Sequence, residues 1–379
     1  MYWFLWGICL ASAGYQLTVI VAAVWHRLRR RQPASAFPGI SVLKPVAGRE
    51  PDFYEAIRSH ASQEYPEFEL LFGVADPNDP ALEDIRRLQA EFPHVAIRIV
   101  HSTTPALNRK VGKLIDLARE AGYPLLVVND ADVIVPANYL RDVAAPLEDT
   151  RTGVVTCIFR CHSPTLVGEW EALGVMADFV PSTLAAPLIG INEFGIGATL
   201  CFRATDLERI GGFPALGAYL ADDYQLAKRI ARLGKRVELS HIVVSSGLQA
   251  ETIGEAWAHQ VRWARTIRVS RLDGYVGLPV TFTSLWAFAA LAAGLWMPAA
   301  IALTARYLMA AVTSTMILRS TLVLRWLPLL PLRDLMGVAI WVAGLTSNTV
   351  EWRGRTLRLD HKGRIAAIEI HEDASVAPR

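Results

Sequence analysis

The chain has 379 residues, a formal net charge of +2 and a hydrophobic fraction of 52%. This balance leaves no excess of positive charge for nucleic-acid binding, and the mean hydropathy of +0.28 is high for a soluble enzyme. The apolar residues are concentrated towards the two ends, so we expect membrane segments on either side of a more polar region.

The beginning of the chain predicts a membrane anchor over residues 1–26. Trp3–Trp25 has no charged side chain and is long enough to cross a hydrocarbon core of about 30 Å. A basic run, His26 to Arg31, follows it directly, whereas a cleaved signal peptide carries its positive charge before the apolar core. Because basic flanks stay in the cytoplasm, we expect the following region to be cytoplasmic.

Residues 38–274 predict a cytosolic α/β domain. Short apolar runs indicate strands at 40–43, 69–74, 95–100, 124–128, 154–158, 198–202 and 237–244. Helical spacing appears at 52–64, 80–91, 110–121 and 222–233. This alternation predicts a mainly parallel sheet with helices on both faces, and such sheets bind ligands beyond the carboxyl ends of their strands.

Polar residues follow the first two of these strands. Lys44-Pro45 comes after the first and Asp76 after the second, so we expect them to meet a ligand at this edge of the sheet. Asp79 instead precedes Pro80 at the start of a predicted helix, and this order is typical of a capping residue.

Asp130 and Asp132 follow the apolar strand at 124–128, in the sequence Asn-Asp-Ala-Asp. Mg²⁺ and Mn²⁺ prefer oxygen ligands, and in nucleotide sites one or two carboxylates are completed by phosphate and water. We therefore predict a divalent metal here, holding a nucleotide diphosphate; the alternative is a solvated loop.

Asp222-Asp223 opens another predicted helix. Adjacent carboxylates repel, which raises the pKa of one of them and suits a general base that takes a proton from an acceptor hydroxyl. The alternative is a doubled helix cap.

Arg262-Trp263 stands at the predicted end of a helix that contains Trp257, near the return to the membrane. A guanidinium can stabilise a leaving diphosphate, and an indole can stack on a sugar or an acceptor. Read alone, the pair is equally typical of an anchor at the membrane interface.

A second membrane block is expected over residues 278–350. Pro279–Trp296 and Met297–Leu318 predict spans joined by a turn at Pro298, with Arg306 snorkelling or facing protein. Trp326–Leu345 is interrupted by Arg333-Asp334. Three crossings would export the basic tail at 351–379, so we expect one segment to be interfacial or re-entrant and the tail to be cytosolic.

Taken together, these motifs resemble glycosyltransferase family 21, the ceramide glucosyltransferases and their bacterial relatives, which include hopanoid-modifying glycosyltransferases. The stretches that carry the resemblance are residues 39–45 with Gly48, 74–80, Asn108-Arg-Lys110, Asp130-Ala-Asp132, Ala221-Asp-Asp-Tyr224, Arg262-Trp263 and Trp352-Arg-Gly-Arg355. Two departures stand out: His259 replaces the family's usual Gln or Arg before Arg-Trp, and both Asp130 and Asp132 are present.

The resemblance implies a cytosol-facing GT-A fold, a UDP-sugar donor, a divalent metal, a lipid acceptor and inversion at the anomeric carbon. It implies that Asp76 contacts the nucleoside, that Asp130 is the metal-site aspartate and that Asp223 is the base. The remaining residues implied to contact the nucleotide sugar are Lys44, Pro45, Asn108, Lys110, His259 and Gln260. Arg262 and Trp263 join Asp223 as catalytic residues, while Asp222 caps its helix or contacts the edge of the site.

We therefore expect an enzyme of a bacterial inner membrane that moves one sugar from UDP-glucose or UDP-N-acetylglucosamine to a ceramide or a hopanoid polyol. Its expected partners are the donor, the lipid and the bilayer, without nucleic acid. One alternative is a processive polysaccharide synthase of glycosyltransferase family 2, for which few spans are available as a channel wall. The other is a non-catalytic nucleotide-sugar-binding membrane protein, which has no need for Asp223.

Overall fold

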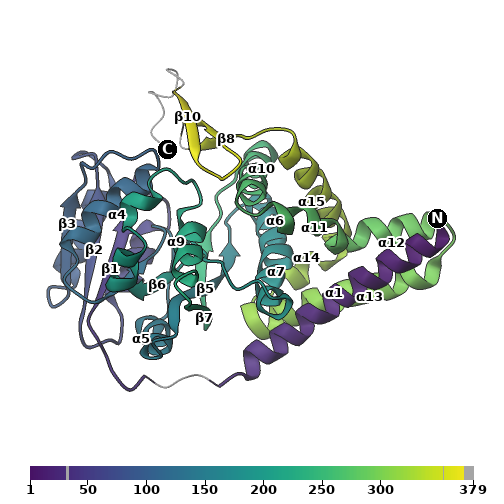
Figure 1. Ribbon diagram of the computed structural model, residues 1–379, viewed down its shortest axis with the longest axis horizontal. Helices are drawn as coiled ribbons and strands as arrows, with labels where there is room; N and C mark the ends of the chain where they lie inside the picture. Colours follow the sequence, from purple (N-terminus) through teal and green to yellow (C-terminus); the bar gives the residue numbers. More distant parts are fainter. Residues whose placement is uncertain (31–33, 353, 371–379) are drawn as a thin grey trace. The chain divides into compact units, whose positions relative to one another are not determined.

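The computed structural model describes residues 1–30, 34–352 and 354–370 (Figure 1). Arg31 of the basic run and Arg353 of the last motif lie outside the described residues. The chain forms two compact units, which we call the sheet unit (residues 30–160 and 191–247) and the helical unit (residues 1–29, 161–190 and 248–379). The domain boundaries expected at residues 38 and 274 stay a prediction.

Within the described residues, the sheet unit is built on a seven-stranded sheet in the order β3-β2-β1-β4-β6-β5-β7. The strands are β1 (Ile40–Pro45), β2 (Phe68–Val74), β3 (Ala96–His101), β4 (Leu125–Val128), β5 (Thr152–His162), β6 (Leu200–Arg203) and β7 (Arg236–Gly247). β3, β2, β1 and β4 run parallel, whereas β6 is antiparallel to both β4 and β5. Each predicted strand is confirmed, and β4 is buried along its whole length because its four apolar residues face covered layers on both sides.

Helices cover this sheet, and the four that were predicted from helical spacing are confirmed. They are α2 (Phe53–Ala61), α3 (Ala81–Glu91), α4 (Arg109–Glu120) and α9 (Asp222–Ala231); α5 (Tyr139–Ala144) and α8 (Ala204–Arg209) are too short for a periodic signal. Leu114 of α4 and Leu226 of α9 share one apolar core with Leu43, Val128 and Phe202 of the strands.

The order of the strands reverses between β1 and β4, and this places a crevice at the carboxyl ends of these two strands. The chain leaves β1 for β2 and β3 on one side and returns to β4 on the other side of β1. The carboxyl ends of β1 and β4 therefore border the crevice in which sheets of this kind bind ligands.

The helical unit contains the long apolar helices. Its helices are α1 (Tyr2–Leu28), α6 (Leu166–Gly174), α7 (Val180–Ala185), α10 (Ile253–Ser270), α11 (Leu272–Gly277), α12 (Thr283–Ala292), α13 (Trp296–Val312), α14 (Leu322–Trp326) and α15 (Leu330–Leu345). Among the described residues, four helical stretches have the length and composition to cross a membrane: Tyr2–Leu28, Leu166–Ile189, Trp296–Leu318 and Leu322–Leu345. A fifth arises if the bent pair Leu272–Thr281 and Thr283–Ala292 is counted as one span.

Three sequence predictions about this unit need correction. The turn between α12 and α13 lies at Ala293–Leu295 around Gly294, whose φ of +75° suits glycine, and Pro298 sits in the first turn of α13. α12 is shorter than the span expected over Pro279–Trp296, because a 3-10 turn at Leu278–Thr281 bends the chain before it. Arg262-Trp263 lies within α10 rather than at its end.

The described part of the tail folds into a small antiparallel sheet of β8 (Thr349–Trp352), β9 (Arg355–Leu359) and β10 (Ile365–Ile370). Arg265 of α10 donates to the carbonyl oxygen of Thr349 at 2.6 Å. This contact attaches the small sheet to α10 within the helical unit.

Candidate active site

The charged side chains predicted from the strand ends gather at the carboxyl edge of the sheet unit. Asp130 and Asp132 follow β4, and Lys44 is the penultimate residue of β1. The first turns of α4 and α9 bring Lys110 and Asp222 to the same edge.

Lys110 is the centre of this cluster. Its Nζ atom lies 2.7 Å from Oδ1 of Asp130 and 3.7 Å from Oδ2 of Asp222. Burial alone lowers the pKa of Lys110, but the carboxylates of Asp130, Asp222 and Asp223 outweigh burial and raise it. Lys110 therefore stays protonated and holds two acidic side chains that would otherwise repel each other.

Asn108 fixes the positions of Lys110 and Asp222. It is fully buried at the start of α4, where its Oδ1 accepts from the backbone N–H of Lys110 at 3.0 Å. Its Nδ2 donates to Oδ1 of Asp222 at 3.1 Å and to the carbonyl oxygen of Tyr219 at 2.9 Å. In this arrangement Asn108 acts through its neighbours, and its predicted contact with a nucleotide sugar stays a prediction.

Lys44 supports the backbone at Asp130. It is fully buried, and its Nζ donates to the carbonyl oxygen of Asp130 at 3.0 Å. Burial lowers the pKa of Lys44 to about 7, although the carboxylates of Asp132 and Asp130 act in the opposite direction. The following residue, Pro45, ends β1 and is half-buried.

A buried polar network behind Asp130 was not predicted from the sequence. Asn129 is fully buried and donates to the hydroxyl of Tyr139 at 2.9 Å and to the carbonyl oxygen of Ala198 at 2.7 Å. Nε2 of His60 lies 3.2 Å from Oδ1 of Asn129, and burial, together with Lys44, lowers the pKa of His60 well below its usual value. The hydrogen bonds that Asn129 donates to Tyr139 and Ala198 hold the end of β4 in place, and His60 packs beside it. The one sequence signal was a histidine on the apolar face of α2.

Asp132 has a partner from a distant strand. Ser246 of β7 donates to Oδ2 of Asp132 at 2.5 Å. Burial and the neighbouring Asp130 both raise the pKa of Asp132. The contact of Ser246 with Asp132 was also not predicted, because nothing in the sequence around a serine in a strand indicates its hydrogen-bond partner.

The pair Asp130 and Asp132 fits the chemistry of a divalent metal. Each presents hard oxygen atoms, and their mutual repulsion is the kind that a cation relieves. Within the described residues no group of three or more His, Cys, Asp and Glu side chains is arranged to hold a metal. The protein would thus supply two carboxylates, and phosphate and water would complete the shell.

Asp223 faces the same space as Asp130. A Cβ atom placed on Gly197 would lie 3.0 Å from Oδ2 of Asp130 and 3.2 Å from Oδ2 of Asp223, so one glycine keeps the space beside both oxygens open. Oδ1 of Asp223 accepts from the backbone N–H of Tyr224 at 2.7 Å. Burial, followed by the charge of Asp222, raises the pKa of Asp223 to about 6.

We expect Gly197→Ala to lower transfer activity roughly tenfold or more, because misplacing reacting groups by a fraction of an ångström has effects of this order. The added methyl group displaces carboxylates rather than backbone, so the unfolding temperature should change little. Single-turnover transfer and thermal unfolding measure the two effects. Gly277→Ala, which meets nothing within 4 Å, is the control, and a fully active Gly197→Ala enzyme would show that the space beside these oxygens is not used.

Asp76 and Asp79 lie in different surroundings beyond β2, one exposed and one buried, and the nucleoside contact of Asp76 stays a prediction. Asp76 is exposed beyond β2, where its Oδ1 accepts from the backbone N–H of Asn78 at 2.9 Å, so it is accessible to a ligand. Oδ1 of Asp79 accepts from the backbone N–H of Ala81, the first residue of α3, at 3.0 Å; Pro80 holds the N-cap position, so Asp79 bonds the start of the helix from one residue further out than predicted. Its Oδ2 also accepts from Gly48 at 2.8 Å and ties the loop after β1 to α3.

The other predicted site residues belong to α10 of the helical unit. Nδ1 of His259 lies 2.6 Å from Oε1 of the buried Glu171, and the rings of His259 and Trp263 are 4.4 Å apart between centroids. Gln260 is buried, while Arg262 and Trp263 are half-buried. The roles assigned to these four residues stay predictions.

Comparisons with known proteins agree with the motifs. A family model described as "Glycosyl transferase family 21" matches residues 4–365. "Ceramide glucosyltransferase 1" of Caenorhabditis elegans is 27% identical over 241 residues, covering 61% of this chain and 51% of its own. "Ceramide glucosyltransferase 3" of the same organism is 25% identical over 253 residues, covering 63% and 52%. The matched region thus spans about half the length of these curated relatives.

A solved structure of similar fold is the mannosyltransferase PcManGT from Pyrobaculum calidifontis, in complex with GDP-Man and Mn²⁺. It is 19% identical, with a TM-score of 0.55, and the match covers 90% of this chain and 97% of that one. This likeness confirms the GT-A fold that the resemblance implied. With the family model matching nearly its whole length, the chain belongs to glycosyl transferase family 21.

Proposed function

We propose that this protein is a membrane glycosyltransferase that moves a single sugar from a UDP-sugar to a lipid hydroxyl. The observation that supports this best is the cluster of Lys110 with Asp130, Asp222 and Asp223 at the carboxyl edge of the sheet. The curated relatives named as ceramide glucosyltransferases support a glycolipid product.

In this mechanism Asp223 takes the proton from the acceptor hydroxyl. The freed oxygen attacks the anomeric carbon from the face opposite the departing UDP, so the configuration inverts. A raised pKa suits this role, because a base near pKa 6 is ionised at neutral pH and still accepts a proton well. Asp222 is held by Asn108 and Lys110, and this leaves proton transfer to its neighbour.

Donor binding in the proposal uses the other half of the cluster. Asp76 contacts the nucleoside beyond β2. A Mg²⁺ or Mn²⁺ ion on Asp130 and Asp132 would neutralise the charge of the leaving diphosphate. Lys110 fixes one oxygen of Asp130 at 2.7 Å and so orients that carboxylate before the donor arrives.

The long apolar helices support a membrane location for the enzyme. We further propose that the sheet unit lies in the cytoplasm of a bacterial cell, at the inner membrane. The support for this orientation is the basic segment from His26 to Arg30, which begins in the last turn of α1 and continues beyond its end.

The test is a panel of donors and acceptors with the purified, detergent-solubilised protein. Labelled UDP-glucose and UDP-N-acetylglucosamine are each offered with ceramide and with a hopanoid polyol, and the products are identified by mass spectrometry. With one of the donor–acceptor pairs, we expect the acceptor lipid to gain a single sugar. The Asp223→Asn protein should give no such product. Absence of transfer with every pair would contradict the proposal, and a polymeric sugar product would indicate a processive synthase instead.

A further inference from the structure

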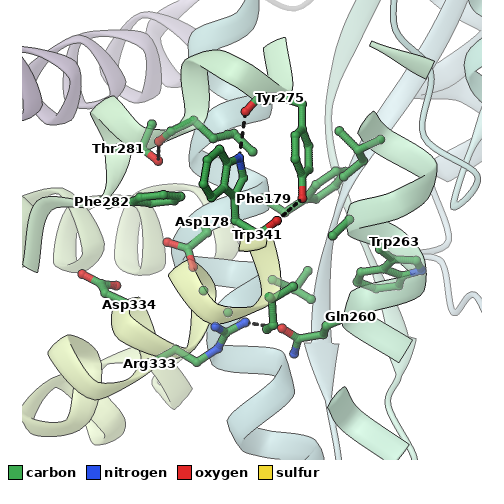
Figure 2. A pocket seen from close by; sticks show the side chains of 17 residues that line it. Asp178, Phe179, Gln260, Trp263, Tyr275, Thr281, Phe282, Arg333, Asp334 and Trp341 are labelled. Atoms are coloured by element: carbon green, nitrogen blue, oxygen red, sulfur yellow. Dashed lines mark hydrogen bonds between the residues drawn. The ribbon is translucent and has the colours of Figure 1, made fainter. Parts of the chain in front are cut away.

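The helical unit contains a cavity of about 180 Å³ that the proposed chemistry does not use (Figure 2). Its walls come from the end of α6 and the segment after it, from α10, α11 and α15, and from the 3-10 turn Leu278–Thr281 with Phe282. The aromatic residues that line it are Phe179, Trp263, Tyr275, Phe282 and Trp341. A cavity of about 150 Å³ accommodates benzene, so this one holds a group of similar size rather than a whole lipid.

Three buried polar side chains line the cavity, Gln260, Arg333 and Asp334, and the first two contact each other. Nη2 of Arg333 donates to Oε1 of Gln260 at 2.5 Å (Figure 2). Nε and Nη1 of Arg333 and Nε2 of Gln260 are buried and have no hydrogen-bond partner within the described part of the chain. Buried donors without partners are costly, and a charged group more so, which points to a ligand that supplies the missing acceptors.

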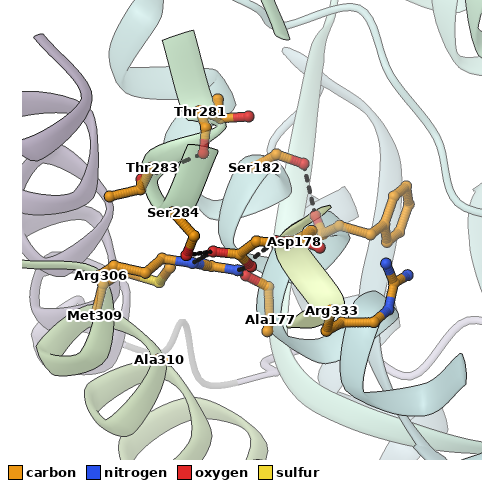
Figure 3. A network of polar contacts seen from close by, with 12 residues as sticks. Ala177, Asp178, Ser182, Thr281, Thr283, Ser284, Arg306, Met309, Ala310 and Arg333 are labelled. Carbon is orange, nitrogen blue, oxygen red and sulfur yellow. Dashed lines mark hydrogen bonds and ion pairs between the residues drawn. The ribbon is translucent and has the colours of Figure 1, made fainter. Parts of the chain in front are cut away.

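The nearby carboxylates are already engaged with another arginine. Arg306 donates to Asp334 through Nε at 3.1 Å and Nη2 at 2.6 Å, and it also meets Oδ1 of Asp178 at 2.6 Å. Figure 3 shows Arg306 within this network and the guanidinium of Arg333 turned away from it. Ser284 donates to Oδ2 of Asp334 at 2.5 Å and fixes that carboxylate further. The prediction that Arg306 snorkels or faces protein is thus resolved in favour of protein.

The charges around the cavity favour a neutral ligand. The two arginines, Arg306 and Arg333, are balanced by Asp178 and Asp334, so a phosphate would meet no excess of positive charge. Three N–H-bearing atoms call for at least two acceptor oxygens, such as an amide carbonyl and a hydroxyl. Ile267, one of the lining residues, is 41% exposed, so this part of the cavity wall reaches the surface of the unit.

We propose that this cavity binds the neutral polar head of the lipid acceptor, whose oxygens accept from Arg333 and Gln260 while its first carbons pack on the aromatic walls. The proposal rests on the function proposed above and deepens it by assigning the acceptor class to named residues. It excludes anionic phospholipids as the preferred occupants. Ceramide and a hopanoid polyol share the required chemistry and are separated by the experiment.

Gly174 offers a way to displace Arg333 without removing it. A Cβ atom on Gly174 would lie 1.7 Å from Nη2 and 2.2 Å from Cζ of Arg333, so the guanidinium rests directly against this glycine. Gly174→Ala must therefore move the guanidinium, whereas Arg333→Lys keeps the charge and removes the planar set of donors. Arg319→Lys, at an exposed position in the same unit, is the matched control.

The experiment measures binding of labelled short-chain ceramide and labelled hopanoid polyol to the purified full-length protein, without donor. We expect Arg333→Lys and Gly174→Ala to weaken binding of the preferred lipid about tenfold to a hundredfold, as for the loss of one or two buried hydrogen bonds. Arg319→Lys should bind as the wild type does. Calorimetric UDP binding should stay unchanged in all variants, and the thermal unfolding of each variant, compared with that of the wild type, shows whether the helical unit is folded.

Wild-type affinity in both cavity variants would overturn the proposal. Phosphatidic acid that displaces the probe more effectively than the neutral lipid itself would overturn it as well. If the lipid binds and the variants weaken it, yet no sugar is transferred, the cavity assignment holds and the proposed function fails. If Arg333→Lys transfers sugar with an unchanged KM for the lipid, the proposed function holds and the cavity assignment fails.

Discussion

Asp223→Asn should lower single-turnover transfer by about 10²–10⁴-fold, the usual loss when a general base is removed. Affinity for UDP should change little, because the proposed role of Asp223 is towards the acceptor rather than the nucleotide. Single-turnover transfer and calorimetric UDP binding, measured on the same preparation, give the two quantities.

Asp222→Asn is the matched control for this experiment. Asp222 meets Asn108 and Lys110, so its replacement should lower stability more than it lowers the chemical step. If Asp223→Asn turns over normally, or loses UDP binding in proportion to rate, Asp223 is not the base.

The same assignment predicts the acid limb of the pH profile. The pKa of Asp223 is raised to about 6, so the carboxylate that accepts the proton is lost as the pH falls through that value. Transfer should thus decline below about pH 6 and level off above it. A rate that stays constant down to pH 5 would contradict a base with this pKa.

Asp130→Ala should reduce transfer by roughly 10²–10³-fold, as expected when stabilisation of a developing negative charge is lost. In the wild type, EDTA should abolish transfer and Mn²⁺ or Mg²⁺ should restore it. The unfolding temperature should fall only modestly, because 46% of the Asp130 side chain is exposed. Activity assays with and without EDTA, together with thermal unfolding, test these expectations.

Asp273→Ala, which changes a side chain that is 74% exposed, is the control for a general loss of charge. Full activity of the wild type in EDTA would remove the metal from the mechanism. If the residual activity of Asp130→Ala is still abolished by EDTA and restored by Mn²⁺ to the same degree as in the wild type, Asp130 does not hold the metal and acts through Lys110 instead.

The sheet was predictable because its strands are short, continuous apolar runs. Leu125–Val128 is buried on both faces and shows no alternation, while α4 and α9 repeat their apolar residues at helical spacing. Asp130 and Asp76 could be placed at one edge from the sequence, because the carboxyl ends of parallel strands lie on the same side of a sheet.

The contacts that position the site were not predictable. His60 reaches Asn129 across 69 residues and Ser246 reaches Asp132 across 114, and no local pattern specifies such pairs. The helical stretch Leu166–Ile189 was missed for a related reason. Acidic residues, among them Asp178, interrupt its apolar run, and the partner of Asp178 is Arg306, 128 residues further along.

The pairing of Arg306 with Asp178 and Asp334 has a consequence for biosynthesis. Asp178 leaves the ribosome long before Arg306, and Arg306 precedes Asp334. A lone carboxylate is poorly tolerated in lipid, so the segment that carries Asp178 should settle among the apolar helices only after α13 has been made. A nascent chain that ends before Arg306 should therefore expose this segment to proteases, and extension through α15 should protect it.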